Sequence, residues 1–506
     1  MTTTTPSPDQ NTAPVAIAGA GPVGLATALG LARAGVRSTV LEKKAQLDPH
    51  SRATLILPRT LEVFRQWDVL DGLLERGNRV SHVRLREPQD GHQILHVDFT
   101  KLAEDTASMF TLAIPQDRTE RVLLDAVEGT GLVEVRFDTE VLAVEQDDSG
   151  VRLRTRTGGA ERTEVVEYLV GADGARSTVR GALGVELVGK TYPTRAMLVD
   201  VRIAPERDRT DEWPTLLGHR GIVVGIRFGD RVWRIIEQAV DETLNGPALQ
   251  HHIAALAEEL FGSGPVEVIW HSVYRKHERR APRFRYGRVL LAGDAAHLNS
   301  PAGGQGMNSG VQDAHNLAWK LAAAVRDPGA DADALLESYS EERTSLVGRF
   351  VQPVTDVLER YQTARPHRRI VLTRALEAFV GLGRSTGTLT RRFSMLDVRY
   401  GESRLLGDHG GGTGVGRRVP DAMTEDGRRL YAAMPAGAVL FAGEGSTPKA
   451  VAARLGLPAV NGDLAALTRF FERGEYVALI RPDHIVGAVA DPAELDRTRF
   501  GAALGR

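Results

Sequence analysis

The feature that most constrains the fold is a short apolar segment that runs directly into a glycine-rich turn near the N-terminus. Val15–Ala18 has the character of a buried strand, and the next six residues, GAGPVG at 19–24, complete a GxGxxG motif. A helical pattern follows at 25–34, and a second strand at 36–41 leads into Glu42. A strand, a glycine turn, a helix and a strand ending in an acid form a dinucleotide-binding unit. The sequence therefore predicts a nucleotide site in this region.

Each glycine of the motif has a separate predicted role. Gly19 permits the tight turn, Gly21 lets a pyrophosphate approach the backbone, and Gly24 lets the helix pack closely on the strand. Val23 lies inside the same turn, and Glu42 is predicted to accept a hydrogen bond from the ribose of the adenosine half. Spacing, context and the acid all agree, so a chance cluster of glycines is a poor explanation.

A second glycine-rich stretch lies at 288–320. An apolar strand at 289–292 is closed by Gly293 and Asp294, and a loop of small residues follows. Asn308 or Ser309 is predicted to cap the next helix. An ordinary strand-to-helix crossover explains the apolar pattern but not four glycines in eight positions, Gly303, Gly304, Gly306 and Gly310. The stretch is therefore predicted to meet a flat or anionic ligand, with Asp294 as acceptor for a sugar hydroxyl.

Composition excludes several classes of protein. A chain of 506 residues is expected to form two or three domains. The net charge of −2 gives no electrostatic case for nucleic acid or an anionic membrane, and the absence of cysteine excludes disulfides and thiolate chemistry. No apolar run approaches the ~20 residues that span a bilayer. The start of the chain, 1–13, resembles a disordered tail rather than a signal peptide, so a cytoplasmic protein is expected.

A third motif lies between these two. Tyr168–Gly171 has the pattern of a strand, and it leads to Asp173-Gly174, Arg176 and a helix from about Ser177. The order GxGxxG, then DG, then GD resembles the class A flavoprotein aromatic hydroxylases, which have the p-hydroxybenzoate hydroxylase fold. The resemblance covers nearly the whole chain. It extends to the segments SRA (51–53), PRTLE (58–62), PQ (115–116) with Glu120, SY (338–339) and ER (342–343).

The resemblance implies an FAD site built from all three motifs. The implied cofactor-binding residues are Gly19, Gly21, Val23, Gly24, Glu42, Arg52, Gln116, Asp173, Asp294, Gly304, Gly306, Met307 and Asn308. Asp173 is also linked to NAD(P)H in such enzymes, and Pro301 lines the pocket above the flavin. One departure is that Thr54 stands where related phenol hydroxylases can carry an acid, so a carboxylate base from that position is absent.

The predicted fold is α/β, with three parts. A discontinuous FAD-binding Rossmann-like domain is expected at 14–80, 110–185 and 280–395. A β-sheet substrate-binding domain is expected at 81–109 and 186–279, because alternating and β-rich runs dominate there. Residues 400–506 resemble the thioredoxin-like C-terminal domain of the phenol hydroxylase and polyketide hydroxylase branch. Without cysteine its implied role is packing or a contact in a possible homodimer.

The implied activity is hydroxylation of a phenolic or polycyclic aromatic substrate by FAD, NADPH or NADH, and O₂, through a flavin C4a-hydroperoxide. The substrate-activating base is not identified, and His219 and Arg220 are pocket candidates beside Pro301. A flavin epoxidase or Baeyer–Villiger enzyme remains an alternative, and a non-catalytic flavin-binding protein is a weaker one. A flavin halogenase is disfavoured because the WxWxIP pattern is missing. No metal site is predicted, because the histidines are scattered along the chain.

Overall fold

The structure is a computed structural model of the chain. It describes residues 13–49, 53–87, 91–208, 213–218, 221–229, 231–241, 243–300, 304–348, 356, 359–361, 364–381, 386–401, 403–406, 414–424, 427–434, 436–442, 449–450, 452–453, 456–462, 464–472, 475–490 and 504. Within them, no helix combines the length and the apolar character needed to cross a membrane.

A six-stranded sheet forms the centre of the molecule, and its strand order is β18-β19-β12-β1-β2-β8. Its strands are β1 (Val15–Ala18), β2 (Ser38–Leu41), β8 (Val133–Arg136), β12 (Tyr168–Gly171), β18 (Arg285–Tyr286) and β19 (Val289–Leu291). All neighbouring pairs are parallel except β18 with β19. Because β12, β1 and β19 share one direction, their carboxyl ends bring the three predicted motifs to the same edge of the sheet.

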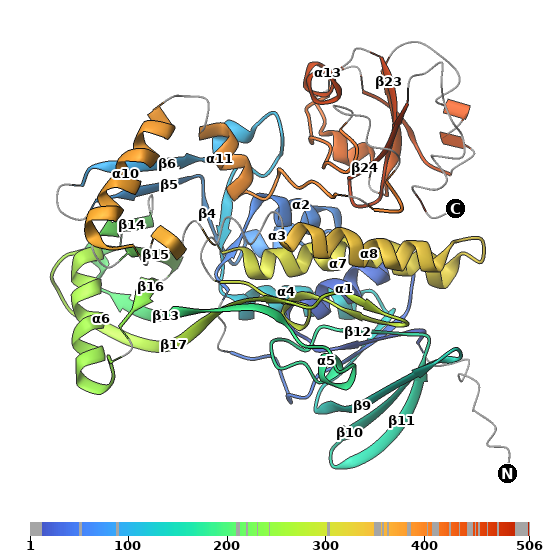
Figure 1. Cartoon of the computed structure of the whole chain (residues 1–506), viewed down its shortest axis with the longest axis horizontal. Helices are drawn as coiled ribbons and strands as arrows, with labels where there is room; N and C mark the ends of the chain where they lie inside the picture. Colours follow the sequence, from blue (N-terminus) through green and yellow to red (C-terminus); the bar gives the residue numbers. More distant parts are fainter. Residues whose placement is uncertain are drawn as a thin grey trace.

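Helices and small sheets surround this central sheet (Figure 1). α1 (Pro22–Arg33) packs on α7 (Gln305–Arg326), which packs on α8 (Ala332–Leu346). Smaller elements complete this part: α2 (Pro58–Gln66), α3 (Leu70–Leu74), α4 (Gln116–Gly129), α5 (Thr178–Ala182), the sheet of β3 (Leu55–Ile56), β7 (Thr111–Ala113) and β4 (Asn78–Val80), and the sheet of β9 (Thr139–Asp147), β10 (Gly150–Thr157) and β11 (Ala160–Val166). The largest hydrophobic core of the molecule lies among them.

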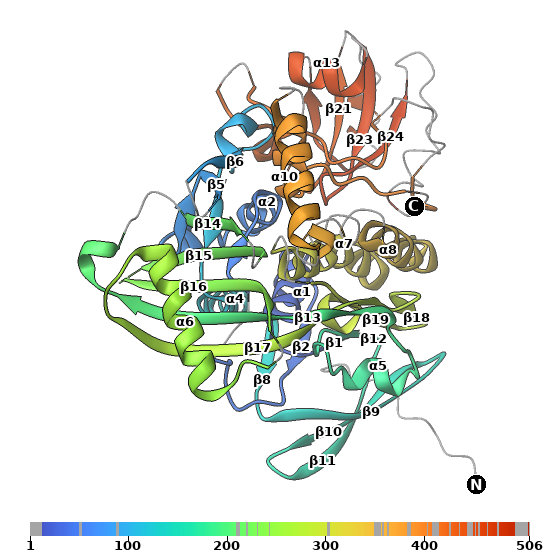
Figure 2. The same cartoon turned by 60° about the vertical axis from the view of Figure 1, so that its left-hand side comes forward.

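The central sheet, with the helices and small sheets around it, forms the nucleotide-binding part of the molecule. An eight-stranded sheet lies beside this part, with the strand order β20-β17-β13-β16-β15-β14-β5-β6. Its strands are β5 (His82–Arg86), β6 (Gln93–Asp98), β13 (Val188–Ile203), β14 (Trp213–Gly218), β15 (Gly221–Gly229), β16 (Val232–Val240), β17 (Val266–Arg280) and β20 (His297–Leu298). α6 (Gly246–Phe261) covers one face through Trp233 and Phe261. α10 (Pro366–Gly381) and α11 (Thr386–Phe393) pack on β6 (Figure 1), and Figure 2 shows α10 beside β6 from a second side.

The C-terminal part is a separate layer built on a four-stranded sheet. Its strands, in the order β22-β21-β23-β24, are β22 (Ala459–Asn461), β21 (Ala438–Ala442), β23 (Tyr476–Ile480) and β24 (Val486–Ala490), with α13 (Ala465–Phe471) beside them. The predicted α/β fold class, with an inserted β-sheet domain and a C-terminal thioredoxin-like α/β domain, is confirmed. The residue boundaries of the three domains stay a prediction.

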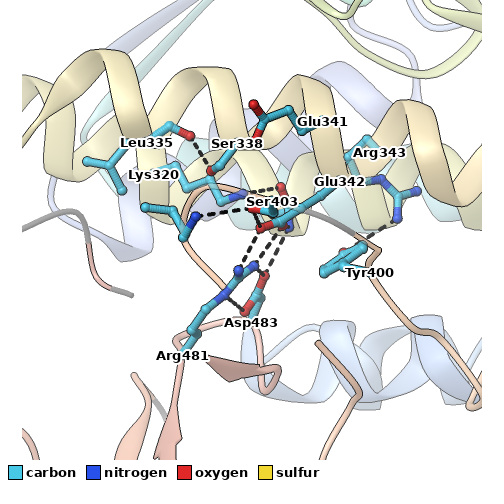
Figure 3. Close-up of polar contacts among 12 residues, drawn as sticks. Lys320, Leu335, Ser338, Glu341, Glu342, Arg343, Tyr400, Ser403, Arg481 and Asp483 are labelled. Carbon is cyan, nitrogen blue, oxygen red and sulfur yellow. Dashed lines mark hydrogen bonds and ion pairs between the residues drawn. The ribbon is translucent and has the colours of Figure 1, made fainter. Parts of the chain in front are cut away.

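Buried charges join the C-terminal part to the helices of the nucleotide-binding part (Figure 3). The Arg481 guanidinium donates to both carboxylate oxygens of Glu342 on α8, at 2.7 and 2.9 Å, and also to Asp483. Lys320 on α7 donates to the same Glu342 at 2.9 Å. All four side chains are at most 1% exposed. Since each charge has an opposite charge beside it, the desolvated cluster is neutral and fixes the C-terminal part against α7 and α8.

Candidate functional site: a continuous cofactor and substrate cavity

A cavity of 1440 Å³ lies at the edge of the central sheet where the three motifs meet. Gly19 and Gly21 line it from the end of β1, Asp173 from the end of β12, and Asp294 from the end of β19. The cavity continues from these residues to the open face of the eight-stranded sheet. Its volume exceeds the roughly 300–1,000 Å³ of a typical ligand site, so it has room for more than one ligand.

Two glycines of the first turn are required by close backbone packing, and a third faces open space. Gly19 has a φ of +101°, and a Cβ there would lie close to the backbone of Ala172 and Asp173. A Cβ at Gly24 would overlap the Gly19 carbonyl group, so this glycine allows α1 to pack against the turn. By contrast, a Cβ at Gly21 would meet no protein atom within 4 Å. The Gly21 backbone therefore faces open cavity, as an approaching pyrophosphate requires.

Glu42 lies beside the glycine turn, at the end of the cavity predicted for adenosine. Its Oε2 accepts a hydrogen bond from the Ala20 amide at 2.8 Å, and its Oε1 accepts one from the Lys44 amide at 3.0 Å. The side chain also lines the cavity. Glu42 thus holds the glycine turn in place, and its contact with a ribose stays a prediction.

Val23 connects the first turn with the second glycine stretch. A Cβ at Gly293 would come within 2.8 Å of the Val23 side chain, and one at Gly310 would meet the same methyl group. Gly293 and Gly310, the latter being one of the four glycines that an ordinary crossover leaves unexplained, therefore make room for Val23. This packing sets α1 against α7 and holds the two halves of the site together.

The helix after the second stretch begins earlier than predicted. α7 starts at Gln305, with Gly304 at φ +66° before it, rather than with a cap at Asn308 or Ser309. Asn308 lies inside the helix and is fully buried. Its amide accepts from Leu57 N at 2.9 Å and donates to Leu55 O at 2.9 Å, so it anchors β3 to α7. Neither Asn308 nor Gly24 lines the cavity, whereas Gly304, Gly306 and Met307 do.

Gln116 lines the cavity, but both ends of its amide already have protein partners. Its Oε1 accepts from Ala53 N at 3.2 Å, and its Nε2 donates to Glu120 at 2.8 Å. Glu120 is 4% exposed, and burial raises the pKa of its carboxyl to about 7. Gln116 therefore fixes the backbone at Ala53, and its partner in the cavity wall is a carboxyl that is about half protonated at pH 7.

Asp313 on α7 organises the turn that carries Asp294. Its Oδ2 accepts hydrogen bonds from Gly293 N at 2.9 Å and His297 Nε2 at 2.7 Å, and its Oδ1 accepts from Arg343 at 2.6 Å. Burial acts to raise the pKa of Asp313, but Arg343 and His297 together keep it below the usual value. The sequence alone does not mark Asp313 as part of the site, because its partners are 16 to 30 positions away. In the helical pattern Asp313 is only one polar position among others.

Four predicted site residues lie outside the described residues: Arg52, Pro301, His219 and Arg220. Their roles stay predictions. Among other polar and aromatic residues of the eight-stranded sheet, Trp213 lines the cavity. Trp233 instead packs against α6, and Arg227 pairs with Asp208.

The walls of the cavity beyond the motifs are mainly apolar and come from the sheet and the two helices above it. They include Val83, Leu85, Leu95, Val97, Leu198, Trp213, Leu217, Ile222, Val224, Ile226, Ile236, Trp270, Leu372, Leu389 and Phe393. Alternation along β5 and β6 turns their apolar side chains inward. This lining suits a flat apolar molecule and excludes water from the region next to α7.

The outer face of the same hairpin holds a group that the sequence reading missed. The side-chain atoms of His82, His96 and Asp98 that could bind a metal ion all lie within 4.8 Å of one another. In the sequence these three residues are polar positions of two alternating strands. The sequence does not show that the two strands pair, so it does not show that the three side chains meet. Asp98 also accepts hydrogen bonds from the Thr100 backbone and hydroxyl, so Asp98 caps the turn that follows β6.

The residues at the motif end of the cavity fit FAD. The open backbone of Gly21 suits a pyrophosphate, Glu42 lies at the adenosine end, and Asp173 and Asp294 offer acceptors between the two ends. A Cβ at Gly306 would also meet nothing within 4 Å, which leaves a flat space beside the start of α7. An extended dinucleotide with a flat ring at one end matches this shape.

Comparison with known proteins agrees with this geometry. The model of the FAD binding domain family matches residues 12–354. The chain is 33% identical over 491 residues to an uncharacterized aromatic compound monooxygenase, YhjG, of Bacillus subtilis, covering 94% of this chain and 93% of that protein. It is 37% identical over 351 residues to 6-methylpretetramide 4-monooxygenase of Streptomyces rimosus, covering 68% of this chain and 61% of that enzyme.

Among solved structures, anhydrotetracycline hydroxylase OxyS from Streptomyces rimosus superposes with a TM-score of 0.78 at 30% identity, covering 98% of this chain and 99% of that chain. The family match spans the three motifs, and the structural match extends across the C-terminal part as well. This chain is therefore a member of the FAD binding domain family, and it is a class A FAD-dependent aromatic monooxygenase.

Proposed function

We propose that this enzyme hydroxylates a phenolic ring of a polycyclic aromatic substrate, with NADPH or NADH as reductant. The observation that carries the proposal is the continuity of one 1440 Å³ cavity from the cofactor motifs to the apolar face of the eight-stranded sheet. The apolar walls extend across β5, β6, β14, β15, β16 and β17, which is more surface than a single ring needs. The similar enzymes named for tetracycline-type substrates support the same size class.

FAD bound at the motif end of the cavity would supply the activation of O₂, with NAD(P)H as the source of electrons. The protein contributes position and environment. α7 begins at the cavity and directs its positive end toward the place predicted for the flavin, where it stabilises negative charge. The apolar walls orient the substrate and exclude water that would divert the reaction. Asp313 holds the turn that presents Asp294 to the cofactor.

A substrate panel tests the size class. Phenol, 2-naphthol and 2-hydroxyanthraquinone carry the same hydroxyl on one, two and three rings. NAD(P)H oxidation and product formation are measured for each compound. We expect the tricyclic compound to give the tightest coupling of NAD(P)H to product. Equal or better coupling with phenol would contradict the polycyclic assignment, and NMR of the product distinguishes ring hydroxylation from epoxidation or ring expansion.

A variant inside the cavity sharpens the same test. Leu217 lines the apolar part of the cavity and is 5% exposed. Leu217→Trp should fill space that only the larger compounds need, so it should raise KM for 2-hydroxyanthraquinone and leave phenol oxidation nearly unchanged. Leu217→Ala is the matched control, because it enlarges the same place. A cytoplasmic location and a homodimer stay predictions of the proposal.

A further inference from the structure

Lys276 is a buried cation that none of the motifs explains. Its side chain, on β17, is 0% exposed. The ammonium group donates to Glu359 at 2.6 Å and to the backbone carbonyl of Gln238 at 2.7 Å. Burial lowers the pKa of Lys276, and the Glu359 carboxylate opposes this shift. Because a buried ion pair is seldom the most stable filling for a core position, its presence calls for a reason other than stability.

The position of Lys276 connects it with the substrate part of the cavity. Trp270, Ser272 and Tyr274 on β17 line the cavity, and Lys276 is the next residue on the same face of the strand. The hydroxyl of Ser300, which also lines the cavity, donates to the second carboxylate oxygen of Glu359 at 2.6 Å. Ser300 immediately precedes the segment that leads into α7. The pair is thus one hydrogen bond away from the cavity, close to the predicted flavin.

An unsatisfied acceptor lies in the same corner. Gln238 lines the cavity and is 6% exposed, and its Oε1 has no hydrogen-bond partner within the described part of the chain. A buried acceptor without a partner costs about 1–3 kcal/mol. A bound molecule with a hydrogen-bond donor would remove that cost. The Gln238 backbone is also a partner of Lys276, so the acceptor belongs to the same cluster.

Other titratable groups lie behind this cluster. The Tyr192 hydroxyl on β13 donates to Glu278 on β17 and to Asp356 at 2.9 Å. Asp356 also pairs with Lys190, which is half exposed. Burial raises the pKa of Glu278, and the charge of Glu359 adds to this shift. Tyr192, Glu278, Asp356 and Lys190 therefore interact with one another. Arg360, the residue after Glu359, lines the cavity.

We propose that Ser300, Glu359 and Lys276 form the site that deprotonates the ring hydroxyl of the substrate, with Gln238 accepting a hydrogen bond from a second donor on the same molecule. The substrate O–H bond breaks, its proton passes to the Ser300 oxygen, and the Ser300 proton passes to the Glu359 carboxylate. The electron pair stays on the substrate oxygen. Lys276 is then no longer balanced by Glu359, and its charge stabilises the phenolate.

The inference rests on the proposed function, because it needs a phenolic substrate. A phenolate ring is a stronger nucleophile than a phenol ring, so its formation prepares the substrate for oxygen transfer. Ser300, a buried residue of the cavity wall, is the group proposed to receive the substrate proton, whereas Lys276 and Glu359 act through it and through charge. The deprotonation site is distinct from the FAD motifs, so changes here should leave cofactor binding intact.

The probe is 2-hydroxyanthraquinone, whose absorbance changes when its hydroxyl ionises. The apparent pKa of the bound probe is measured by difference spectroscopy with the FAD-loaded enzyme, and kcat is measured across pH. Lys276→Met should raise the apparent pKa of the bound probe by at least about one unit, a tenfold change. Glu359→Gln should lower kcat about 100-fold below the pKa of the probe, with recovery as pH rises.

Three further variants serve as controls for the measurements of the probe pKa and kcat. Glu267→Gln makes the same chemical change at an exposed residue of β17 that pairs with Arg202, so both measurements should match the wild type. Glu359→Asp should restore part of the rate. If either single variant fails to fold, Lys276→Met/Glu359→Gln removes both charges together, and it should both raise the probe pKa and shift the kcat profile.

A naphthol pair tests the role of Gln238. Gln238→Leu should raise KM for naphthalene-2,3-diol about tenfold and leave KM for 2-naphthol nearly unchanged, because only the diol carries a second donor.

Two results would contradict different parts of the account. If the Lys276→Met and Glu359→Gln variants fold, bind FAD and still hydroxylate, an unaltered probe pKa and an unaltered pH profile would overturn the deprotonation site alone. A wild-type enzyme that neither binds nor oxidises any of these phenols would overturn the proposed function, and this inference with it.

Discussion

The carboxylate of Asp313 accepts a hydrogen bond from the amide of Gly293 at 2.9 Å, and both residues are buried. This contact joins the middle of α7 to the turn that carries Asp294. Arg343 on α8 completes the arrangement by pairing with the other carboxylate oxygen at 2.6 Å. The turn that carries Asp294 is therefore held by charges that lie behind it, outside the cavity.

Asp313→Asn should weaken both folding and FAD binding. The change leaves Arg343 buried without its counter-charge, which costs about 3–5 kcal/mol. Thermal unfolding and the FAD retained after gel filtration measure the two effects. Asp333→Asn is the matched control, because Asp333 pairs with Arg285 but is 84% exposed. That control should change stability by less than about 1 kcal/mol. Equal effects of the two variants would contradict the organising role of Asp313.

Alanine at two glycines of the first turn should separate cofactor binding from folding. At Gly21 a methyl group meets no protein atom, and the backbone has an ordinary φ of −71°, so Gly21→Ala should keep its stability but lose FAD affinity. At Gly24 the methyl group collides with Gly19, so Gly24→Ala should lower the melting temperature. FAD titration and thermal unfolding without FAD check both. A destabilised Gly21→Ala protein, or one with normal FAD affinity, would be the opposite result.

The pH dependence of stability should reveal Glu120. Its pKa is about 7 in the folded protein against 4.5 in the unfolded chain, so the folded state binds more protons between these values. Stability should therefore fall as pH rises from about 4.5 to 7, by up to about 3 kcal/mol from this group. Glu120→Gln should unfold at a higher temperature than the wild type at pH 8 and at a similar temperature at pH 4.5, at matched FAD occupancy. A constant difference across pH would argue against the raised pKa.

The C-terminal part should depend on Arg481 for its attachment. Arg481→Ala leaves Glu342 buried with only Lys320 as a counter-charge, so it should destabilise by about 3–5 kcal/mol. Arg481→Met/Glu342→Gln removes both charges and should recover part of that loss. Arg469→Ala is the control, because it breaks an exposed pair that the C-terminal part makes with Glu104, in the segment after β6. Protease sensitivity of the C-terminal part and thermal unfolding report the outcome, and similar behaviour of the two alanine variants would count against the buried cluster.

The sequence predicts the parts of the site that depend on local backbone. Val15–Ala18 and Tyr168–Gly171 form strands at the predicted positions, because short apolar runs before glycine turns leave few alternatives. The predicted start of α7 was wrong by a few residues. A polar side chain such as Asn308 resembles a helix cap, but the residue that directly precedes the helix is Gly304, at positive φ.

The missed residues depend on contacts that are distant in sequence. Lys276 and Glu359 are 83 positions apart, and nothing in their neighbours marks either as one of a buried pair. His82 and His96 meet only because β5 pairs with β6 in a register that the pattern does not define. Asp313 looks like any polar residue of a helix until α8 is placed beside it. Local periodicity in the sequence predicts helices, strands and motifs. Which side chains contact one another across the molecule is seen only in the folded structure.

Oxygen labelling tests the central claim most directly. The FAD-loaded enzyme is supplied with NADPH or NADH, 2-hydroxyanthraquinone and ¹⁸O₂, and the product is analysed by mass spectrometry and NMR. The account predicts a ring-hydroxylated product carrying one ¹⁸O atom, formed with consumption of the reduced nicotinamide. Product without label, or consumption of NADPH and NADH that yields only peroxide with every phenol in the panel, would contradict it.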